Sequence, residues 1–223
     1  MPYASSYQRA VWVMAIFAVG LLMRLVMLAC DYWQYQLMGP VLRNEAVTYE
    51  QLETGDNLLT LLSAAWLVWY PATVIAFLMW KHRAHRNLPS LGAGGLHFSP
   101  RGAVGWYFVP FLNLFKPYQV MREIYNASEP GDASEDRIDW HYRYAPAVVK
   151  TWWTLFLFMN LVGNAVARAS FHADTPGAYQ FVAAVSMVDD TLSIAAMLAA
   201  MWLVWSITKR QEDRAAALSF RFA

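Results

Sequence analysis

The chain has 223 residues, of which 58% are hydrophobic and 15% are charged. Soluble domains usually carry about 25% charged residues, so this composition argues against an ordinary soluble protein and for one that contacts lipid. The net charge of +1 gives no reason to expect a nucleic-acid partner. Cys30 is the only cysteine, which excludes an internal disulfide and a cysteine-rich metal site, and we expect no metal or other cofactor.

Four segments are apolar over about the twenty residues that a helix needs to cross a hydrocarbon core. They run from about 10 to 33, 58 to 80, 147 to 167 and 180 to 208. Continuous helices are expected there because each unpaired backbone group in lipid costs several kcal/mol. The sequence therefore predicts an all-α polytopic membrane protein with four transmembrane helices, forming a single membrane domain over residues 1–223.

The lysines and arginines are distributed unevenly around these segments. Fourteen of the 17 lie before the first segment, in the stretch from Lys81 to Lys150, or after the fourth segment. The loop between the first two segments is instead acidic, with Asp31, Glu45, Glu50, Glu53 and Asp56. Because cytoplasmic loops carry the excess of basic residues, we expect both termini and the insert 81–146 in the cytoplasm.

Residue types near the segment ends give two finer predictions. The loop 34–57 is expected to hold one short helix, because Thr48 and Gln51 have capping-box spacing and Gly55 suits a helix end. Six tryptophans near the predicted inner boundary suggest an aromatic belt at the lipid headgroups. They are Trp12, Trp80, Trp152, Trp153, Trp202 and Trp205.

The cytoplasmic insert contains an apolar stretch at residues 103–115. This stretch is too short to cross a bilayer and contains Pro110, so we expect it to be interfacial, re-entrant or packed against the other helices.

An amphipathic helix is predicted directly after this stretch, from Pro117 to about Ala127. Its apolar face carries Val120, Ile124 and Tyr125, while its edge or wet side carries Lys116, Arg122 and Glu123. The acidic residues 128–139 include a proline and a glycine, which favours a mobile linker.

Short motifs follow one another from the second apolar segment to the C-terminal tail. They are FLMW at 77–80, Arg83, RN at 86–87, FSP at 98–100, GWYFVP at 105–110, NL at 113–114, KPYQVMREI at 116–124, WW at 152–153 and ITKRQ at 207–211. In this order they resemble the bacterial membrane proteins catalogued as domain of unknown function 4328, over roughly residues 58–211. The resemblance implies a multi-pass protein of the bacterial inner membrane without an assigned activity, and it implies no catalytic residue.

Basic and polar side chains of the insert form the first candidate site. Each basic residue near a membrane surface contributes about 1 kcal/mol of attraction to anionic headgroups. These residues either anchor the insert to the membrane, or bind a lipid headgroup or a small cytoplasmic anion, or belong to a protein-docking surface. The candidates are Arg83, Arg86, Asn87, Arg101, Asn113 and Lys116.

His82 and His85 are one helical turn apart in the same region. The neighbouring Lys81, Arg83 and Arg86 repel a metal cation, so we expect a solvated basic turn and not a metal site.

Charged residues inside the predicted spans form the second candidate site. Arg24 would lie about 9 Å from the outer end of its segment, and Asp189 and Asp190 about 14 Å from the same side. Charges at such depths are usually paired or functional. We expect Arg24 to pair with one aspartate but not with both, because adjacent helical residues point about 100° apart. Asn160 and Asn164 either join this polar interior or bond neighbouring helices together.

Three interpretations of this second site stay open. It is a structural ion pair, or a proton or cation site with one carboxylate left free. In the third, the last helix covers only residues 191–207 and Asp190 is its cap.

The sequence has no catalytic serine, zinc-protease or phosphate-loop motif. We therefore expect a non-enzymatic membrane protein that engages lipid or a partner protein through its cytoplasmic insert. The alternative is a small transporter or channel component, which also predicts a homo-oligomer because four helices enclose only a small pore. A membrane-embedded enzyme is the third and weakest alternative.

Overall fold

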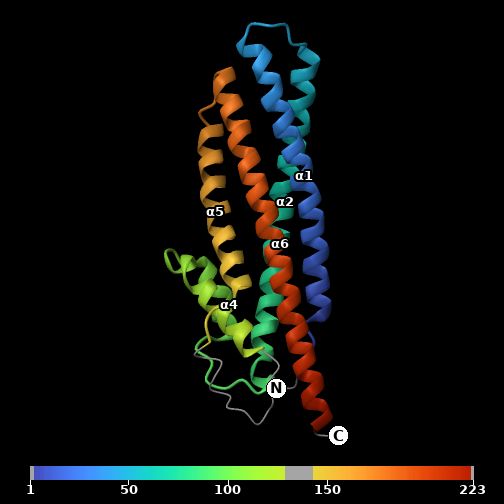
Figure 1. Cartoon of the computed structure of the whole chain (residues 1–223), viewed down its shortest axis with the longest axis vertical. Helices are drawn as coiled ribbons and strands as arrows, with labels where there is room; N and C mark the ends of the chain where they lie inside the picture. Colours follow the sequence, from blue (N-terminus) through green and yellow to red (C-terminus); the bar gives the residue numbers. More distant parts are fainter. Residues whose placement is uncertain (1–2, 129–142, 222–223) are drawn as a thin grey trace. The chain divides into compact units, whose positions relative to one another are not determined.

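The computed structural model describes residues 3–128 and 143–221, and these residues contain helices but no strand. Four of the helices are long, and along the chain the short helices come after the second long helix and before the third (Figure 1). The long helices are α1 (Tyr7–Leu42), α2 (Tyr49–Asn87), α5 (Ala147–Ser170) and α6 (Pro176–Arg221). The short ones are η1 (Pro89–Leu91), α3 (Pro100–Gly105), η2 (Trp106–Phe108), η3 (Leu112–Leu114) and α4 (Lys116–Ala127).

Three helices in the described part of the chain are long and apolar enough to cross a membrane: α1, α2 from Asn57 onward, and α6. Their apolar side chains are widely exposed; Leu67 and Val68 of α2, for example, are each 75% exposed. Such exposure over a whole helix face is typical of contact with lipid. The predicted third segment is also a helix, α5, but it is not among the three, because lysine, arginine and asparagine residues lower its mean hydropathy.

The helix ends correct two predictions. No short helix interrupts 34–57: α1 continues to Leu42, α2 begins at Tyr49, and Gly55 lies inside α2. A glycine costs a helix only about 1 kcal/mol, and here it makes room for a ring, since a Cβ on Gly55 would lie 3.1 Å from Trp33. The interpretation of Asp190 as a cap is also wrong, because α6 runs through it without a break.

The chain forms two compact units. Unit 1 comprises Met1–Ile16, Thr73–Trp153 and Ala199–Ala223, and unit 2 comprises Phe17–Ala72 and Thr154–Leu198. The predicted linker 128–139 falls in unit 1, but apart from Ser128, which ends α4, it lies outside the described residues.

Unit 1 is organised around α4, which begins one residue before the predicted Pro117 and ends at Ala127 as predicted. Its residues Val120, Met121 and Ile124 are fully buried, as expected for the apolar face of an amphipathic helix. The C-terminal end of α4 is bonded to α6, since Gln211 donates to Ser128 Oγ at 2.9 Å and Arg214 donates to the Ala127 carbonyl at 3.0 Å.

Glu123 is the point on α4 where the prediction fails. Its side chain is only 4% exposed, and four donors converge on it. Oε1 accepts from His85 Nε2 at 3.1 Å and from the Phe98 N–H at 3.3 Å. Oε2 is bonded to the N–H of His97 at 2.8 Å and lies 3.3 Å from its Nδ1. The carboxylate is buried because these bonds replace its hydration, and it fixes the loop before α3 against α4 and α2.

The predicted solvated turn at 81–86 is also wrong for two of its residues. Lys81 and His85 are both fully buried. Lys81 Nζ donates to Tyr107 Oη at 3.1 Å and to the Pro117 carbonyl at 3.3 Å. These bonds join α2 to η2 and to the first turn of α4.

The tryptophans divide into two groups. Trp12, Trp202 and Trp205 are exposed, which agrees with an aromatic belt. Three others are buried in unit 1, where Trp80 Nε1 donates to Thr208 Oγ1 at 3.0 Å and Trp153 Nε1 donates to the Leu114 carbonyl at 3.1 Å. For Trp80, Trp152 and Trp153 the belt prediction is therefore wrong.

Replacing Glu123 by Gln should destabilise unit 1 by about 1–3 kcal/mol, because the buried donors lose a charged acceptor. Burial by itself raises the pKa of Glu123, but the bonds from His85, His97 and Phe98 outweigh it and hold the pKa below its ordinary value of 4.5. The stabilisation is therefore complete above pH 4.5 and is lost as the pH falls through the lower folded-state pKa. Thermal unfolding in detergent as a function of pH measures both effects.

The matched control for this experiment is Arg122→Gln, since Arg122 is the exposed neighbour of Glu123 on α4. Its melting temperature should equal that of the wild type at every pH. Equal melting temperatures for Glu123→Gln and the wild type near pH 7 would contradict the role given to Glu123.

Candidate functional site

Arg24 of α1 forms the centre of a buried charged group in unit 2. Its Nη1 donates to Asp189 Oδ2 at 3.0 Å and to Asp190 Oδ1 at 2.6 Å, and the three side chains are 13%, 12% and 3% exposed. The predicted pairing between the first and last long helices is thus present. The expectation that only one aspartate reaches Arg24 is wrong, because the Asp189 and Asp190 side chains converge on one guanidinium nitrogen despite their different directions along α6.

A third carboxyl belongs to this group. Asp31 of α1 is 9% exposed, and its side chain is hydrogen-bonded to that of Asp190. The sequence interpretation assigned Asp31 to the acidic outer loop and so missed it. The available signal was its spacing of seven residues from Arg24, which places both on one face of a helix.

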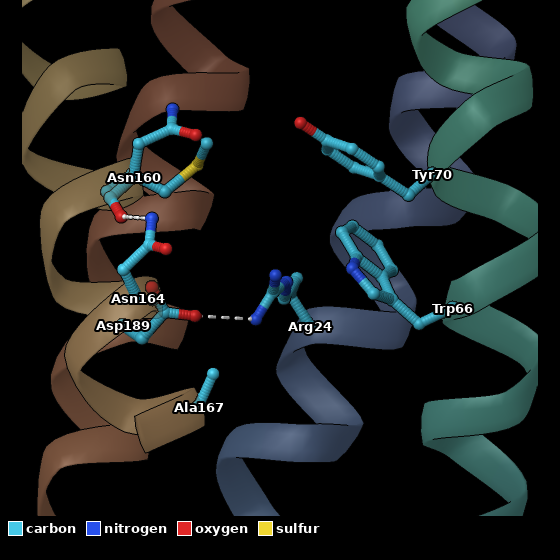
Figure 2. Close-up of a pocket in the computed structure, with 9 residues that line it drawn as sticks. Arg24, Trp66, Tyr70, Asn160, Asn164, Ala167 and Asp189 are labelled. Atoms are coloured by element: carbon cyan, nitrogen blue, oxygen red, sulfur yellow. Dashed lines mark hydrogen bonds and ion pairs between the residues drawn. The ribbon is translucent and has the colours of Figure 1, made fainter. Parts of the chain in front are cut away.

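A cavity of about 240 Å³ lies beside Arg24 and Asp189. Trp66 and Tyr70 of α2 line one wall, and Asn160, Asn164 and Ala167 of α5 line the opposite wall (Figure 2). Figure 2 shows Arg24 between these walls, with its bond to Asp189. All five residues predicted for this site therefore lie together, four of them around the cavity and Asp190 at the other bond of Arg24.

The walls of the cavity have different chemistry. The guanidinium of Arg24 lies over the Trp66 ring, 4.2 Å from its centroid, in a cation–π contact. The amides of Asn160 and Asn164 donate to backbone carbonyls one turn earlier in α5, at 2.7 Å each. Each amide thus makes a bond within α5, which favours the interpretation that the two residues line a polar interior over the one that they bond helices together.

Gly163 allows the close approach of α5 to this site. A Cβ at Gly163 would lie 3.2 Å from Asp189 Oδ1, so any side chain here would have to displace the carboxylate.

Several buried polar atoms of the group lack a hydrogen-bond partner among the described residues. They are Arg24 Nε, Asp189 Oδ1 and Asp190 Oδ2. Each such atom costs about 1–3 kcal/mol, so this is a place where water, a proton or a ligand is energetically favoured. Within the described ranges, no group of three or more His, Cys, Asp or Glu side chains has the geometry of a metal site.

The residues of the first candidate site lie in unit 1 and have unequal roles. Asn87 is buried and donates to the Ala4 carbonyl at 2.9 Å and to Gln211 at 3.4 Å, which gives it a structural role. Arg83 and Arg86 lie near Arg9, close enough for their charges to interact. Sequence reasoning did not include Arg9 in this site, because Arg9 lies in a different helix, far from Arg83 and Arg86 in the sequence.

The other predicted residues of the first site surround the apolar stretch. Arg101 is exposed and Asn113 is half-buried. Lys116 donates to Gln119 at 3.2 Å and lies over the rings of Phe98 and Trp106 at 5.5 and 5.9 Å.

The apolar stretch itself exposes large side chains. Phe111, at the turn between η2 and η3, is 82% exposed and has a positive φ of 63°, a backbone conformation that is rare for a residue with a side chain. The second half of the stretch 103–115 is therefore not packed against the other helices. The exposed apolar residues are Phe108, Val109, Phe111, Leu112, Leu114 and Phe115.

The fold and the site define a helical protein of membrane type, with three apolar helices of spanning length and charged residues buried among its helices. The chain belongs to the family described as "Domain of unknown function (DUF4328)", which matches residues 43–209. The family resemblance of the sequence motifs is thus confirmed, over a range that begins earlier than residue 58. No curated protein and no solved structure matches the chain.

Replacing Arg24 by Gln should destabilise the protein by about 3–5 kcal/mol, because it leaves buried carboxylates without their cation. Adding Asp189→Asn and Asp190→Asn to that variant should recover much of the loss, since the uncompensated charges are then removed. Thermal unfolding in detergent measures both variants. A triple variant as unstable as Arg24→Gln, or a stable Arg24→Gln, would show that the charge pair is not what holds these helices.

Proposed function

We propose that the chain is a four-span protein of the bacterial inner membrane, with both termini and the insert 81–146 in the cytoplasm. The fourth span is α5, whose 24 residues extend about 36 Å, enough for a hydrocarbon core of about 30 Å. The orientation is supported by the concentration of lysine and arginine in the termini and the insert.

Within this architecture, the protein acts as a small transporter or channel component for a monovalent cation. The observation that carries this proposal is the cavity beside Arg24 and Asp189, in helices that are otherwise apolar. Two carboxyl groups contact one guanidinium and a third, Asp31, is bonded to one of them, so the group has more acidic side chains than an ion pair requires. Ionisable groups among membrane-spanning helices generally mark ion or proton pathways, because a purely structural role is served at lower cost by apolar packing.

The cavity provides the surroundings that a transported cation needs. The amides of Asn160 and Asn164 and the carboxylate of Asp189 line the cavity and supply neutral and charged acceptors, and the volume holds several waters. Four helices enclose only a small pore, and the working form is therefore a homo-oligomer.

In proteoliposomes, Asp189→Asn should reduce cation flux by about tenfold or more, the factor that 1.4 kcal/mol of lost binding gives. Flux of H⁺ is followed with an enclosed pH-sensitive dye, and flux of Na⁺ and K⁺ with isotopes. Asp174→Asn is the matched control, because it removes an exposed carboxylate of unit 2 away from the cavity and should leave flux unchanged. Wild-type flux no faster than that of empty liposomes for all three ions would overturn the proposal.

A second candidate function is engagement of anionic lipid headgroups by the insert. The observation that favours it is the exposed apolar surface at residues 108–115, followed directly by Lys116 and preceded by the exposed Arg101. Apolar side chains that enter the headgroup region beside basic residues are typical of interfacial segments. The group of Arg9, Arg83 and Arg86 supplies further positive charge in the same unit.

Anionic lipid should therefore raise the melting temperature of the detergent-solubilised protein more than zwitterionic lipid does. The double variant Arg83→Gln, Arg86→Gln should reduce this difference by about 4 °C or more, since each basic residue near a lipid surface contributes about 1 kcal/mol. Arg168→Gln, which removes an exposed arginine of unit 2, should leave the difference unchanged. Equal effects of the two lipids on the wild type would rule the candidate out.

A further inference from the structure

One hydrogen bond of the charged group lacks a visible donor. The Asp190 carboxylate is 2% exposed, and its Oδ1 accepts from Arg24 Nη1 at 2.6 Å. Its other oxygen, Oδ2, has no donor among the described residues, although the Asp31 carboxyl is hydrogen-bonded to Asp190. Ionised carboxylates only accept hydrogen bonds, so a bond between two of them requires a proton.

We propose that Asp31 and Asp190 share one proton, and that this carboxyl pair is a proton-binding site of the protein. The proton is carried as O–H on one carboxyl and is donated to an oxygen of the other. Its release to water leaves two carboxylates and breaks the bond between them. The net charge of Arg24, Asp31, Asp189 and Asp190 then changes from one negative charge to two.

The surroundings of the pair favour the proton. Arg24 of α1 is the one cation in the salt bridges that the described residues make to these carboxyls, and Asp189 of α6 shares it. The Cys30 thiol of α1 lies near enough to Asp31 and Asp190 to interact with their charges, and the Tyr70 hydroxyl of α2 does the same with Arg24; both groups are ordinarily neutral at pH 7. The helix α5 contributes the uncharged amides of Asn160 and Asn164 to the cavity beside Arg24.

Without a proton, Asp31 and Asp190 would be two buried carboxylates in hydrogen-bonding contact. Within the described part of the chain, the only positive charge bonded to this pair would be that of Arg24, which Asp189 also binds. Like charges at such separations do not both ionise readily, and one carboxyl of the pair keeps its proton.

The pair is connected to the cavity through a single atom. Arg24 Nη1 bonds both Asp190, which shares the proton with Asp31, and Asp189, which lines the cavity. Loss of the proton strengthens the attraction of Asp190 for Arg24. Arg24 then neutralises Asp189 less, and Asp189 attracts a cation in the cavity more strongly. The role of the proton site in transport rests on the proposed function and adds to it that H⁺ is the ion exchanged against the cation. Binding of the proton itself is measured without any flux.

The test is infrared spectroscopy of the full-length protein in lipid near pH 7. Exposed carboxyls are ionised at this pH, so a carboxylic-acid C=O band that shifts in D₂O reports a buried protonated carboxyl. The wild type should show this band. Asp31→Asn and Asp190→Asn should each abolish it, while Asp174→Asn should retain it.

Each outcome decides the proposal. Absence of the band in the wild type, or its persistence in both Asp31→Asn and Asp190→Asn, overturns the shared proton. Absence of the band in the wild type overturns the proposal without any variant, and where one variant fails to fold, loss or persistence of the band in the other variant decides whether the pair carries the proton. A wild-type band that both variants lose, in a protein without cation flux, establishes the proton site and overturns only the transport function. Cation flux in a protein whose wild-type spectrum lacks the band supports the transport function and overturns only the proton site.

Discussion

The pairing of Arg24 with Asp189 and Asp190 is the constraint on which unit 2 depends. A charge among apolar helices is tolerated only with an opposite charge in direct contact, because the helices offer nothing else to replace its hydration. Here one guanidinium nitrogen serves two carboxylates from the same helix, at 3.0 and 2.6 Å. That geometry brings α1 and α6 together at one place within unit 2, and the cavity forms beside it.

Unit 1 meets the same requirement with different residues. Its buried polar groups include Lys81, His85, Glu123 and Gln211, and each of these four is bonded to a backbone or side-chain group of another segment. Such bonds fix the segments of the unit against one another, because a buried donor or acceptor without its partner is costly. Burial of the apolar side chains of α4 contributes favourable free energy of folding, and the polar network decides which loop lies against which helix.

The two units also differ in the functions they favour. Unit 1 exposes an apolar stretch among basic side chains, a combination suited to a charged lipid surface. Unit 2 conceals acidic side chains around a single arginine next to a cavity, a combination suited to a small cation or a proton. The two proposed roles, lipid attachment and transport, therefore use different units and do not exclude each other.

The sequence by itself determined the helical class, the places of the long helices, the amphipathic α4 and the family. These follow from local patterns: apolar runs, Pro117 at a helix start and ordered short motifs. It also indicated that Arg24 pairs with one of two aspartates in the last long helix, because a charge in an apolar run needs a partner; that both aspartates contact Arg24 was not predicted.

Only the tertiary structure decided which polar residues are buried. Glu123, Lys81 and His85 lie among charged neighbours in the sequence, and their burial depends on donors and acceptors that come from other segments. Asp31 was missed for the same reason: local composition places it in an acidic loop, whereas the length of α1 and the position of Asp190 place it in the site. Burial of a polar group is a property of the contacts around it, and those contacts exist only after the helices have packed.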